Sequence, residues 1–401
     1  MAGNLCKMSI RIFLIVLGVI TPSLFPLVPS LQAEVLENGE ANPEEEEADI
    51  IEELKLFSKA LAVIQEAYPE DVNQRQLLYK AVDGMLKSLD KFSEFIEPER
   101  YELLQIHMRG EYAGIGATLQ LIDNFPAIKD LRPDSAAIKA GLLPEDKIIK
   151  INGDTTLGFS LVDAAKLLRG EEETALVLTI QRDRTHETFD VKIVREIVEI
   201  ESVKDARLVG KSIGYFWIES WQDKTAEQVD KAIESLKKQG MRALIIDLRQ
   251  NDGGLLPQAV ALSERFLEKD KKIVSVDSKI EEQRKEYIST GKNHIGNYPL
   301  VILVNQISAS ASEIFTACMQ DHHRGTVIGH QTYGKASVQS VVPLDEKSAM
   351  KLTTARYLSP LGRDINHIGL VPDEVVENGP AGGPNTDRQI LKALEILREY
   401  M

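Results

Sequence analysis

Apolar positions in the first half of the chain follow two different periods. Between residues 50 and 89 they recur every three or four residues, which predicts two amphipathic helices separated near Pro69. From Tyr112 onward the apolar residues instead form short β-branched runs, which predict strands joined by Gly-rich turns. The predicted strands cover 114–122, 127–133, 147–153 and 175–183, with a helix over 160–170. This mixture indicates a small ligand-binding module over residues 111–195.

The second half of the chain alternates strands that are apolar on both faces with amphipathic helices. Such strands are typical of a buried sheet with helices packed on it, so the sequence predicts an α/β core over residues 196–375. The predicted strands are 212–218, 243–249 and 299–305, and the predicted helices are 225–240, 255–267 and 311–322. A last segment, 376–401, contains an amphipathic helix over 387–400 that we expect to serve packing or assembly.

Residues 1–33 have the features of a secretory signal peptide. Lys7 and Arg11 precede an apolar core at 12–20, and the sequence SLQA offers a cleavage site after Ala33. The apolar core is well short of the ~20 residues that a membrane span needs. Leu31 is larger than the residue usually found three positions before a cut, so an uncleaved membrane anchor is the alternative. The segment that follows, 34–49, is acidic and poor in apolar residues, which predicts a linker.

Composition narrows the range of partners. The 401 residues leave room for two or three domains, and the net charge of −15 disfavours nucleic acid and anionic membranes as ligands. Cys6 would leave with the signal peptide, so Cys318 would have no partner for an internal disulfide.

The stretch GHQTYGKAS, residues 329–337, resembles a phosphate-binding loop only superficially. Gly329, Gly334 and Lys335 have the right spacing, but Ala336 stands where that motif needs a hydroxyl residue. The residues after Lys335 alternate like a strand, whereas a phosphate loop leads into a helix. We therefore expect no nucleotide. The adjacent His322 and His323 lack neighbours at ligand spacing, so we expect no metal and no cofactor.

The sequence NQISASASEI, residues 305–314, is a better candidate for chemistry. A buried strand breaks there into small residues and restarts as a helix, so a serine at the break faces unpaired amides and a positive helix dipole. The histidines show no triad spacing, but a lysine whose pKa is lowered by burial can serve as the base. Lys335 is a candidate, although its spacing alone favours an exposed turn lysine.

Several long motifs in consistent order make the chain recognisable. It resembles the C-terminal processing, or tail-specific, serine peptidases, which combine a PDZ domain with a Ser-Lys catalytic site on a crotonase-like or ClpP-like α/β core. The segments that carry this resemblance are GMLKSLDKFSEFI (84–96), YAGIGA (112–117), AGLLPEDKIIKING (140–153), LIIDLRQNDGGLL (244–256), ILVNQISASASEIF (302–315), GHQTYGKASVQ (329–339) and LTTARYLSPLGRDINHIGLVPD (352–373).

The resemblance implies a role for individual residues of the catalytic site. Ser310 corresponds to the nucleophile, Lys335 to its general base and Gln339 to the residue that orients the lysine. The backbone amides of Gly253 and Ala311 correspond to the oxyanion hole. Ser308 and Ser312 are then a turn residue and a helix-start residue, and the glycines at 253–254 also fit a plain strand-to-helix turn.

The PDZ resemblance implies that the loop formed by Gly114, Ile115, Gly116 and Ala117 binds the carboxylate at the C-terminus of a peptide. Arg169 corresponds to a residue that senses this occupancy at the protease core, or is a solvated arginine at a helix end. The chain departs from the family at three positions: Ala336 replaces a Gly, Ala136 a Pro and Glu145 a Gly. Of these, Ala336 adjoins the expected base and puts the catalytic rate in question.

The sequence thus predicts an exported, periplasmic serine endopeptidase that recognises protein C-termini and cleaves through an acyl-enzyme. Residues 50–110 would form a helical region that packs within one chain or dimerises, and a homo-oligomer is expected. The resemblance also implies an adaptor protein that delivers substrates. The competing hypothesis is a non-catalytic PDZ scaffold, a pseudoprotease inactivated at Ala336.

Overall fold

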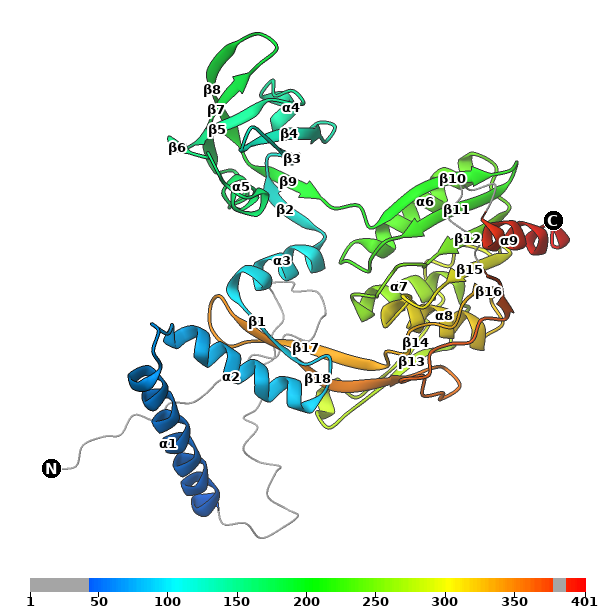
Figure 1. Cartoon of the computed structure of the whole chain (residues 1–401). Helices are drawn as coiled ribbons and strands as arrows, with labels where there is room; N and C mark the ends of the chain where they lie inside the picture. The colour runs from blue at the N-terminus through cyan, green and yellow to red at the C-terminus, as the bar shows by residue number, and fades with distance from the viewer. Residues whose placement is uncertain (1–42, 378–386) are drawn as a thin grey trace. The chain divides into compact units, whose positions relative to one another are not determined.

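The computed structural model describes residues 43–377 and 387–401, which form two compact units (Figure 1). The first unit holds the residues up to Glu102 together with Ser275–Glu286 and Ala336–Leu358. The second holds Leu103–Val274, Tyr287–Lys335 and Ser359–Met401. The predicted signal peptide and residues 34–42 of the predicted linker lie outside the described residues. In the part that is described, no helix is long and apolar enough to cross a lipid bilayer.

The first unit combines two N-terminal helices with an antiparallel sheet. Its elements are α1 (Pro43–Ala67), α2 (Gln74–Leu89), β1 (Glu94–Ile96), β17 (Ser337–Pro343) and β18 (Ala349–Leu358). The strands β17 and β18 form a hairpin, β1 (Glu94–Ile96) pairs with β18 at Ala349–Lys351, and the end of β13 (Lys272–Ser278) pairs with β18 at Ala355–Leu358. The short elements η1 (Glu281–Gln283) and β14 (Lys285–Ile288) follow β13.

Helix α1 begins at Pro43, inside the segment 34–49 that the sequence predicts to be a linker, so that prediction was wrong for residues 43–49. Two local features explain the early start. Proline is well suited to the first position of a helix, because its missing N–H would have no partner there. The sequence after Pro43 is also rich in glutamate, a composition that favours the first turn of a helix.

The second unit opens with a small β module. Its sheet has the order β3-β4-β5-β7-β8, with β6 paired to β5, so β3 is an edge strand. The elements are α3 (Pro98–Arg109), which leads in from the first unit, β2 (Glu111–Gly114), β3 (Ala117–Ile122), β4 (Phe125–Leu131), α4 (Ala136–Lys139), β5 (Lys147–Ile151), β6 (Asp154–Thr155), α5 (Leu161–Leu168), β7 (Ala175–Arg182), β8 (Glu187–Val194) and β9 (Glu196–Glu199). The predicted strand 114–122 is in fact two strands, because Gly116 has φ 73° and breaks the extended backbone.

The rest of the second unit is an α/β core around a six-stranded sheet. The sheet order is β10-β11-β12-β15-β16-β19, and all neighbours are parallel except β10 and β11. The elements are β10 (Val203–Val209), β11 (Ile213–Ile218), α6 (Thr225–Lys238), β12 (Ala243–Asp247), α7 (Leu256–Phe266), β15 (Leu300–Val304), α8 (Ala311–Asp321), β16 (Thr326–Gly329), β19 (Glu374–Val375) and α9 (Arg388–Glu399).

Helices cover this sheet and explain its apolar strands. Helix α9 packs Ile390, Leu394 and Leu397 against one face, onto side chains of β11, β12, β15 and β16. Helices α6, α7 and α8 pack in sequence against one another. The strands β12 and β15 are buried at every position, as the prediction of a sheet covered on both faces requires.

The predicted limits of the core, 196–375, differ from the limits of the compact unit that the folded chain forms. Residues 275–286 and 336–358 lie within those limits but belong to the first unit. The reason is the hairpin of β17 and β18, which pairs with β1 from far earlier in the chain. Pairing over such a sequence distance leaves no mark in a local hydrophobic pattern. The strand predicted after Lys335 is confirmed as β17.

The turn after β12 depends on glycine. Gly254 has φ 140°, and a Cβ at this position would lie 2.2 Å from the carbonyl oxygen of Trp221. The two residues form a parallel bridge, in which the Trp221 carbonyl accepts from the Leu255 N–H at 2.8 Å. Any side chain would therefore have to push the backbone of a buried bridge apart.

We predict that Gly254→Ala lowers the stability of the protein by about 3 kcal/mol, because the substitution adds a backbone clash to an unfavourable φ. The matched control is Gly210→Ala, since Gly210 has φ 67° but a Cβ added there would have nothing within 4 Å. That control should lose only about 1 kcal/mol. Thermal and chemical unfolding of both variants measures the difference, and equal losses would show that the close approach to Trp221 is unimportant.

Candidate active site

The candidate site is built at the carboxyl ends of three neighbouring parallel strands. Strand β12 leads into the turn 248–254, β15 into the segment 305–310, and β16 into the segment 330–335. Because β12, β15 and β16 are adjacent and parallel, these three loops meet at one edge of the sheet. The edge brings together residues that are far apart in sequence, and it contains most of the predicted catalytic residues.

Ser310 is the last residue of the segment that follows β15, and it is the N-cap of helix α8. It is half-buried and has φ 53° and ψ −115°, a conformation that non-glycine residues rarely adopt. Such a conformation costs about 1–3 kcal/mol and persists only where the surroundings impose it. A strained serine at a helix N-terminus fits the predicted nucleophile.

The neighbouring serines have structural roles, as predicted. The buried Ser308 hydroxyl donates to the Leu248 carbonyl at 2.8 Å and accepts from the Asn305 N–H at 2.9 Å. The buried Ser312 hydroxyl donates to the Asn251 carbonyl at 3.1 Å and accepts from the Trp221 indole at 2.9 Å. Both hydroxyls therefore tie the segment around Ser310 to the turn after β12.

A buried carboxylate that the sequence reasoning missed links Ser310 to Lys335. Glu313 is fully buried, and its Oε2 accepts from the backbone N–H groups of Ser310 and Lys335, both at 2.9 Å. Its Oε1 accepts from the Thr332 hydroxyl at 2.5 Å and from the Gly334 N–H at 2.8 Å. Ser310 and Lys335 are thus bound through their backbones to one oxygen atom. An acidic residue three positions after a helix-start serine is a capping-box signal, which could have singled out Glu313.

The loop that carries Lys335 is fixed at several points. Gly334 has φ 84°, and the Thr332 hydroxyl accepts from the Leu370 N–H at 2.7 Å while it donates to Glu313. The Tyr333 N–H donates to the Ser308 carbonyl at 3.0 Å. Lys335 itself is half-buried, which fits neither a fully exposed turn lysine nor a core residue.

Gln339 and Ala336 belong to the first unit. Gln339 lies on β17, where its side-chain amide donates to Ser337 Oγ at 2.8 Å and to Thr353 Oγ1 at 3.4 Å. Ala336 is fully buried, and its carbonyl accepts from the Tyr357 N–H at 2.9 Å. The alanine that replaces the glycine expected from the resemblance therefore has its side chain fully buried.

The glycine turn comes close to the predicted nucleophile. A Cβ on Gly253 would lie 2.8 Å from the Cβ of Ser310 and 3.2 Å from the backbone nitrogen of Ala311. The structure therefore brings Gly253, Ser310 and Ala311 together. The Gly253 N–H donates to Asn251 Oδ1 at 2.9 Å, so this amide already has an acceptor inside the protein. Asn251 is fully buried, and its Nδ2 donates to the Ile218 carbonyl at 2.8 Å.

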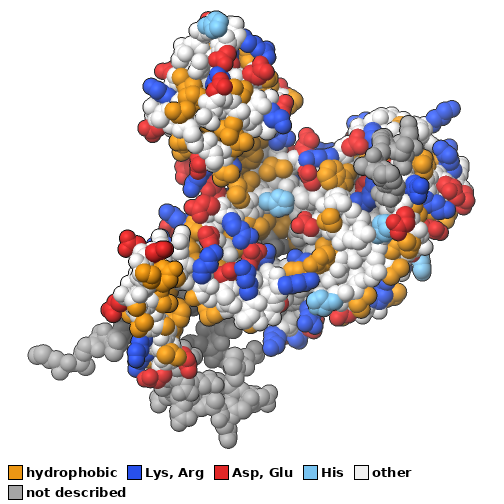
Figure 2. Space-filling view, in the orientation of Figure 1, with side chains coloured by type: hydrophobic (Ala, Val, Ile, Leu, Met, Phe, Trp, Pro, Cys, Tyr) orange, Lys and Arg blue, Asp and Glu red, His pale blue; other side chains and the backbone are white. Residues whose placement is uncertain are grey.

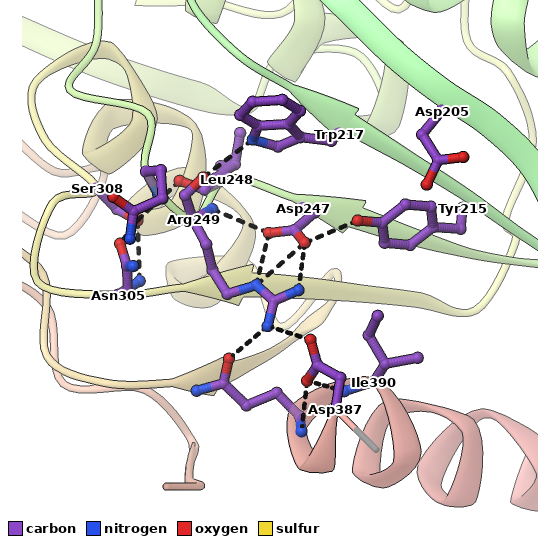
Figure 3. A network of polar contacts seen from close by, with 12 residues as sticks. Asp205, Tyr215, Trp217, Asp247, Leu248, Arg249, Asn305, Ser308, Asp387 and Ile390 are labelled. Carbon is purple, nitrogen blue, oxygen red and sulfur yellow. Dashed lines mark hydrogen bonds and ion pairs between the residues drawn. The ribbon is translucent and has the colours of Figure 1, made fainter. Parts of the chain in front are cut away.

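An ion pair lies directly before the glycine turn. Arg249 donates from Nε to Asp247 at 2.9 Å, and the Tyr215 hydroxyl donates to the other Asp247 oxygen at 2.9 Å (Figure 3). Burial and the charge of Asp247 both raise the pKa of Tyr215, so its hydroxyl stays protonated. Burial by itself lowers the pKa of Arg249, but the hydrogen bonds and charges of Asp247 and Asp387 outweigh it and raise that pKa. Arg249 is therefore a permanent cation at this position.

In the β module, the predicted carboxylate-binding loop runs between β2 and β3. The carbonyl of Ile115 accepts from the Ala137 N–H at 2.9 Å, and that of Gly116 accepts from the Arg132 N–H at 3.0 Å. The peptide bonds are trans, so the N–H that follows each carbonyl points in the opposite direction. The amides of Gly116 and Ala117 consequently point away from these donors.

Arg169 ends helix α5 within the same module. Its guanidinium carbon lies 5.9 Å from the centre of the Tyr112 ring on β2, a cation–π arrangement. A Cβ on Gly114 would lie 3.7 Å from Cγ of Arg169. Arg169 therefore packs against the strand that leads into the predicted carboxylate-binding loop.

Comparison with known proteins gives three matches to domain families along the chain. Peptidase family S41 matches residues 212–376, the PDZ domain matches residues 128–182, and the activating protease CtpB N-terminal domain matches residues 27–99. These matches fall on the α/β core, on the β module and on the N-terminal helices.

Individual relatives extend over most of the chain. It is 34% identical over 335 residues to the carboxy-terminal-processing protease of Bartonella bacilliformis, which covers 82% of this chain and 76% of that protein. It is 32% identical over 335 residues to the carboxyl-terminal-processing protease of Picosynechococcus, covering 81% of this chain and 80% of that protein. Among solved structures, the photosystem II D1 C-terminal processing protease is 28% identical, covering 80% of this chain and 92% of that chain, with a TM-score of 0.45.

The predicted family and fold class are confirmed by these matches. The chain belongs to peptidase family S41 as a carboxy-terminal-processing serine protease, with a CtpB-like N-terminal helical domain, a PDZ domain and an α/β protease core of the ClpP or crotonase type.

Proposed function

We propose that this serine protease cleaves through a Ser-Lys mechanism in which Ser310 is the nucleophile and Lys335 the general base. The neutral amine of Lys335 takes the proton of the Ser310 hydroxyl as Oγ attacks the scissile carbonyl carbon. The lysine then gives this proton to the departing amine, which leaves an ester on Ser310. Water, deprotonated by the same lysine, attacks the ester, and the lysine returns this proton to Ser310 Oγ as the second product leaves. The observation that carries this proposal is the attachment of both residues, through their N–H groups, to Glu313 Oε2.

The proposed oxyanion hole consists of the backbone amides of Ala311 and Gly253. The position of Ala311 at the start of α8 supports this role, because amides in the first turn have no partner within the helix. The Gly253 N–H would exchange or share its acceptor, Asn251 Oδ1, with the substrate oxygen. Gln339 would orient Lys335, as the family resemblance implies.

The proposed ligand of the PDZ domain is the C-terminus of a protein substrate. The outward amides of Gly116 and Ala117 could donate to a terminal carboxylate, and the edge strand β3 could accept the peptide as an added strand. Helix α5 contacts β3, so the two elements would form the walls of the peptide site. Arg169, packed on Tyr112, would report occupancy through β2.

The proposed assembly is a homo-oligomer that uses the N-terminal helices. Helix α1 exposes Leu54, Leu56 and Phe57 among other apolar side chains, and Figure 2 shows hydrophobic side chains gathered over this part of the chain. Exposed apolar area of this kind is typical of an interaction surface. The proposed site of action is the periplasm, reached through the signal peptide, and an adaptor that delivers substrates stays a prediction.

The first test is cleavage of a protein with an accessible C-terminus by wild type, Ser310→Ala and Lys335→Ala. We expect kcat to fall by about 10⁴-fold in the serine variant and by about 10³-fold or more in the lysine variant, because each removes a reacting group. The control is Ser235→Ala, because Ser235 is an exposed serine on α6 whose loss should leave kcat close to wild type. Equal activity in wild type, Ser310→Ala and Lys335→Ala would contradict the assignment.

The second test concerns Glu313. In Glu313→Gln, one side-chain oxygen becomes an amide donor that faces N–H or O–H donors, so buried hydrogen bonds are lost. We expect kcat to fall by about tenfold or more, together with a lower melting temperature. Steady-state kinetics and thermal unfolding measure the two effects, and an unchanged kcat would show that the carboxylate is not needed to hold Ser310 and Lys335.

The third test concerns the PDZ ligand. Two substrate peptides that differ only in a free or an amidated C-terminus should differ in affinity by about tenfold or more, because amidation removes the charge-assisted hydrogen bonds to the loop amides. Binding is measured with the Ser310→Ala variant, so that the peptide is not consumed. Equal affinity for both peptides would argue against recognition of the C-terminus.

A further inference from the structure

The guanidinium of Arg249 lies between two carboxylates that are far apart in the sequence of the protease core. One is Asp247, two residues earlier at the end of β12, and the other is Asp387, directly before the C-terminal helix α9 (Figure 3). The Asp387 carboxylate accepts from Nη1 of Arg249 at 2.7 Å. The same Nη1 donates to Oε1 of Gln389 at 2.9 Å. The C-terminal helix therefore holds one side of the guanidinium, and β12 holds the other.

The start of α9 is arranged around this contact. Asp387 uses its other oxygen to cap the helix, accepting from the N–H groups of Gln389 and Ile390 at 3.0 and 3.1 Å. Gln389 is fully buried, and its side-chain amide donates to the Val376 carbonyl at 2.8 Å. Because Asp387 joins the cap to the ion pair, the position of Arg249 is linked to that of the first turn of the helix.

A short chain of hydrogen bonds leads from Arg249 to the nucleophile. The carbonyl of Arg249 accepts from the Trp217 indole at 2.9 Å, which fixes the peptide at the beginning of the glycine turn. The preceding carbonyl, of Leu248, accepts from the Ser308 hydroxyl. The following N–H, of Gln250, donates to Asn305 Oδ1 at 3.1 Å. The residues on either side of Arg249 thus both bind the segment that carries Ser310.

The charges explain why Asp387 matters for this geometry. Arg249 and Asp387 are only 13% and 16% exposed in their side chains, so solvent screens their attraction weakly. Without Asp387, the guanidinium would keep Asp247 and the Gln389 amide oxygen as acceptors, but it would lose its second charged partner. A planar cation bound from two sides is fixed in direction as well as in position.

We propose that Asp387 is a positioning residue for catalysis: through Arg249 it fixes the turn that connects β12 to the glycines and to the segment of Ser310. The start of the C-terminal helix then helps to place the nucleophile, whereas the rest of that helix covers the sheet. This inference rests on the proposed role of Ser310.

Two substitutions separate the cap from the ion pair. Asp387→Ser keeps a good helix cap but removes the carboxylate that binds Arg249. Asp387→Glu keeps a carboxylate but is a poorer cap. We expect Asp387→Ser to lower kcat by about tenfold with KM within about twofold of wild type, since one charged hydrogen bond is lost. Asp387→Glu should recover most of the activity, although its melting temperature is the lower of the two.

The control for helix stability is Leu397→Ala. Leu397 lies on the same helix, where it is buried against the sheet, and it is ten residues after Asp387 in the sequence. This variant should lower the melting temperature while kcat, measured well below that temperature, stays close to wild type. The rate at which a fluorophosphonate labels Ser310 gives a second readout, and it should fall in Asp387→Ser alone.

Each outcome is decisive. Wild-type kcat and labelling in Asp387→Ser would overturn the inference while leaving the proposed function intact. A loss of kcat that follows melting temperature equally in Asp387→Ser, Asp387→Glu and Leu397→Ala would also overturn it, because stability alone would explain the data. A wild-type protein without protease activity would overturn the proposed function, and this inference with it.

Discussion

The site depends above all on one buried carboxylate, that of Glu313. A charged group without access to water is tolerated only when its oxygens are well supplied with hydrogen bonds. Glu313 receives them from the backbones of Ser310, Gly334 and Lys335 and from the Thr332 hydroxyl. The requirement works in both directions. The carboxylate needs these donors, and the two loops that supply them are thereby held in one mutual arrangement.

The surrounding structure supplies what this carboxylate alone cannot. Parallel strands bring the three loops to a common edge, and the unusual backbone of Ser310 is tolerated because Ser308 and Ser312 are bound to the turn after β12. Gly253 and Gly254 allow that turn to approach Ser310 and Trp221 more closely than any side chain would permit. At this candidate site each loop is therefore tied to its neighbour by hydrogen bonds.

The PDZ domain and the C-terminal helix use simpler versions of the same principle. In the PDZ domain the carbonyls of Ile115 and Gly116 are bound inside, so the planar peptide unit leaves the next amides directed outward. At the C-terminus, Asp387 serves helix and guanidinium with its two oxygens. In both places, atoms that are already engaged on one side hold the neighbouring atoms in a fixed direction.

Much of the site could be predicted from the sequence, because it lies in local patterns. The periodicity predicted α5 to α9 and the strands β11, β12 and β15 to within a few residues, and the small residues between β15 and α8 marked the segment of Ser310. The alternation after Lys335 predicted a strand, as β17 confirms. The sequence pattern did not predict the start of α1. An acidic composition is typical of linkers, but acidic residues also favour a helix N-terminus.

Other features were decided by tertiary structure alone, because they join residues far apart in the chain. The pairing of β18 with β1 assigns 336–358 to the first unit, and Glu313 binds Lys335 across 22 positions. Arg249 meets Asp387 across 138 positions. Such contacts form only when the folded chain brings distant residues together, so the hydrophobic periodicity of the sequence does not predict them. The sequence by itself determined most of the elements, the family and the candidate residues. The tertiary structure decided which of these residues lie together around the buried carboxylate of Glu313.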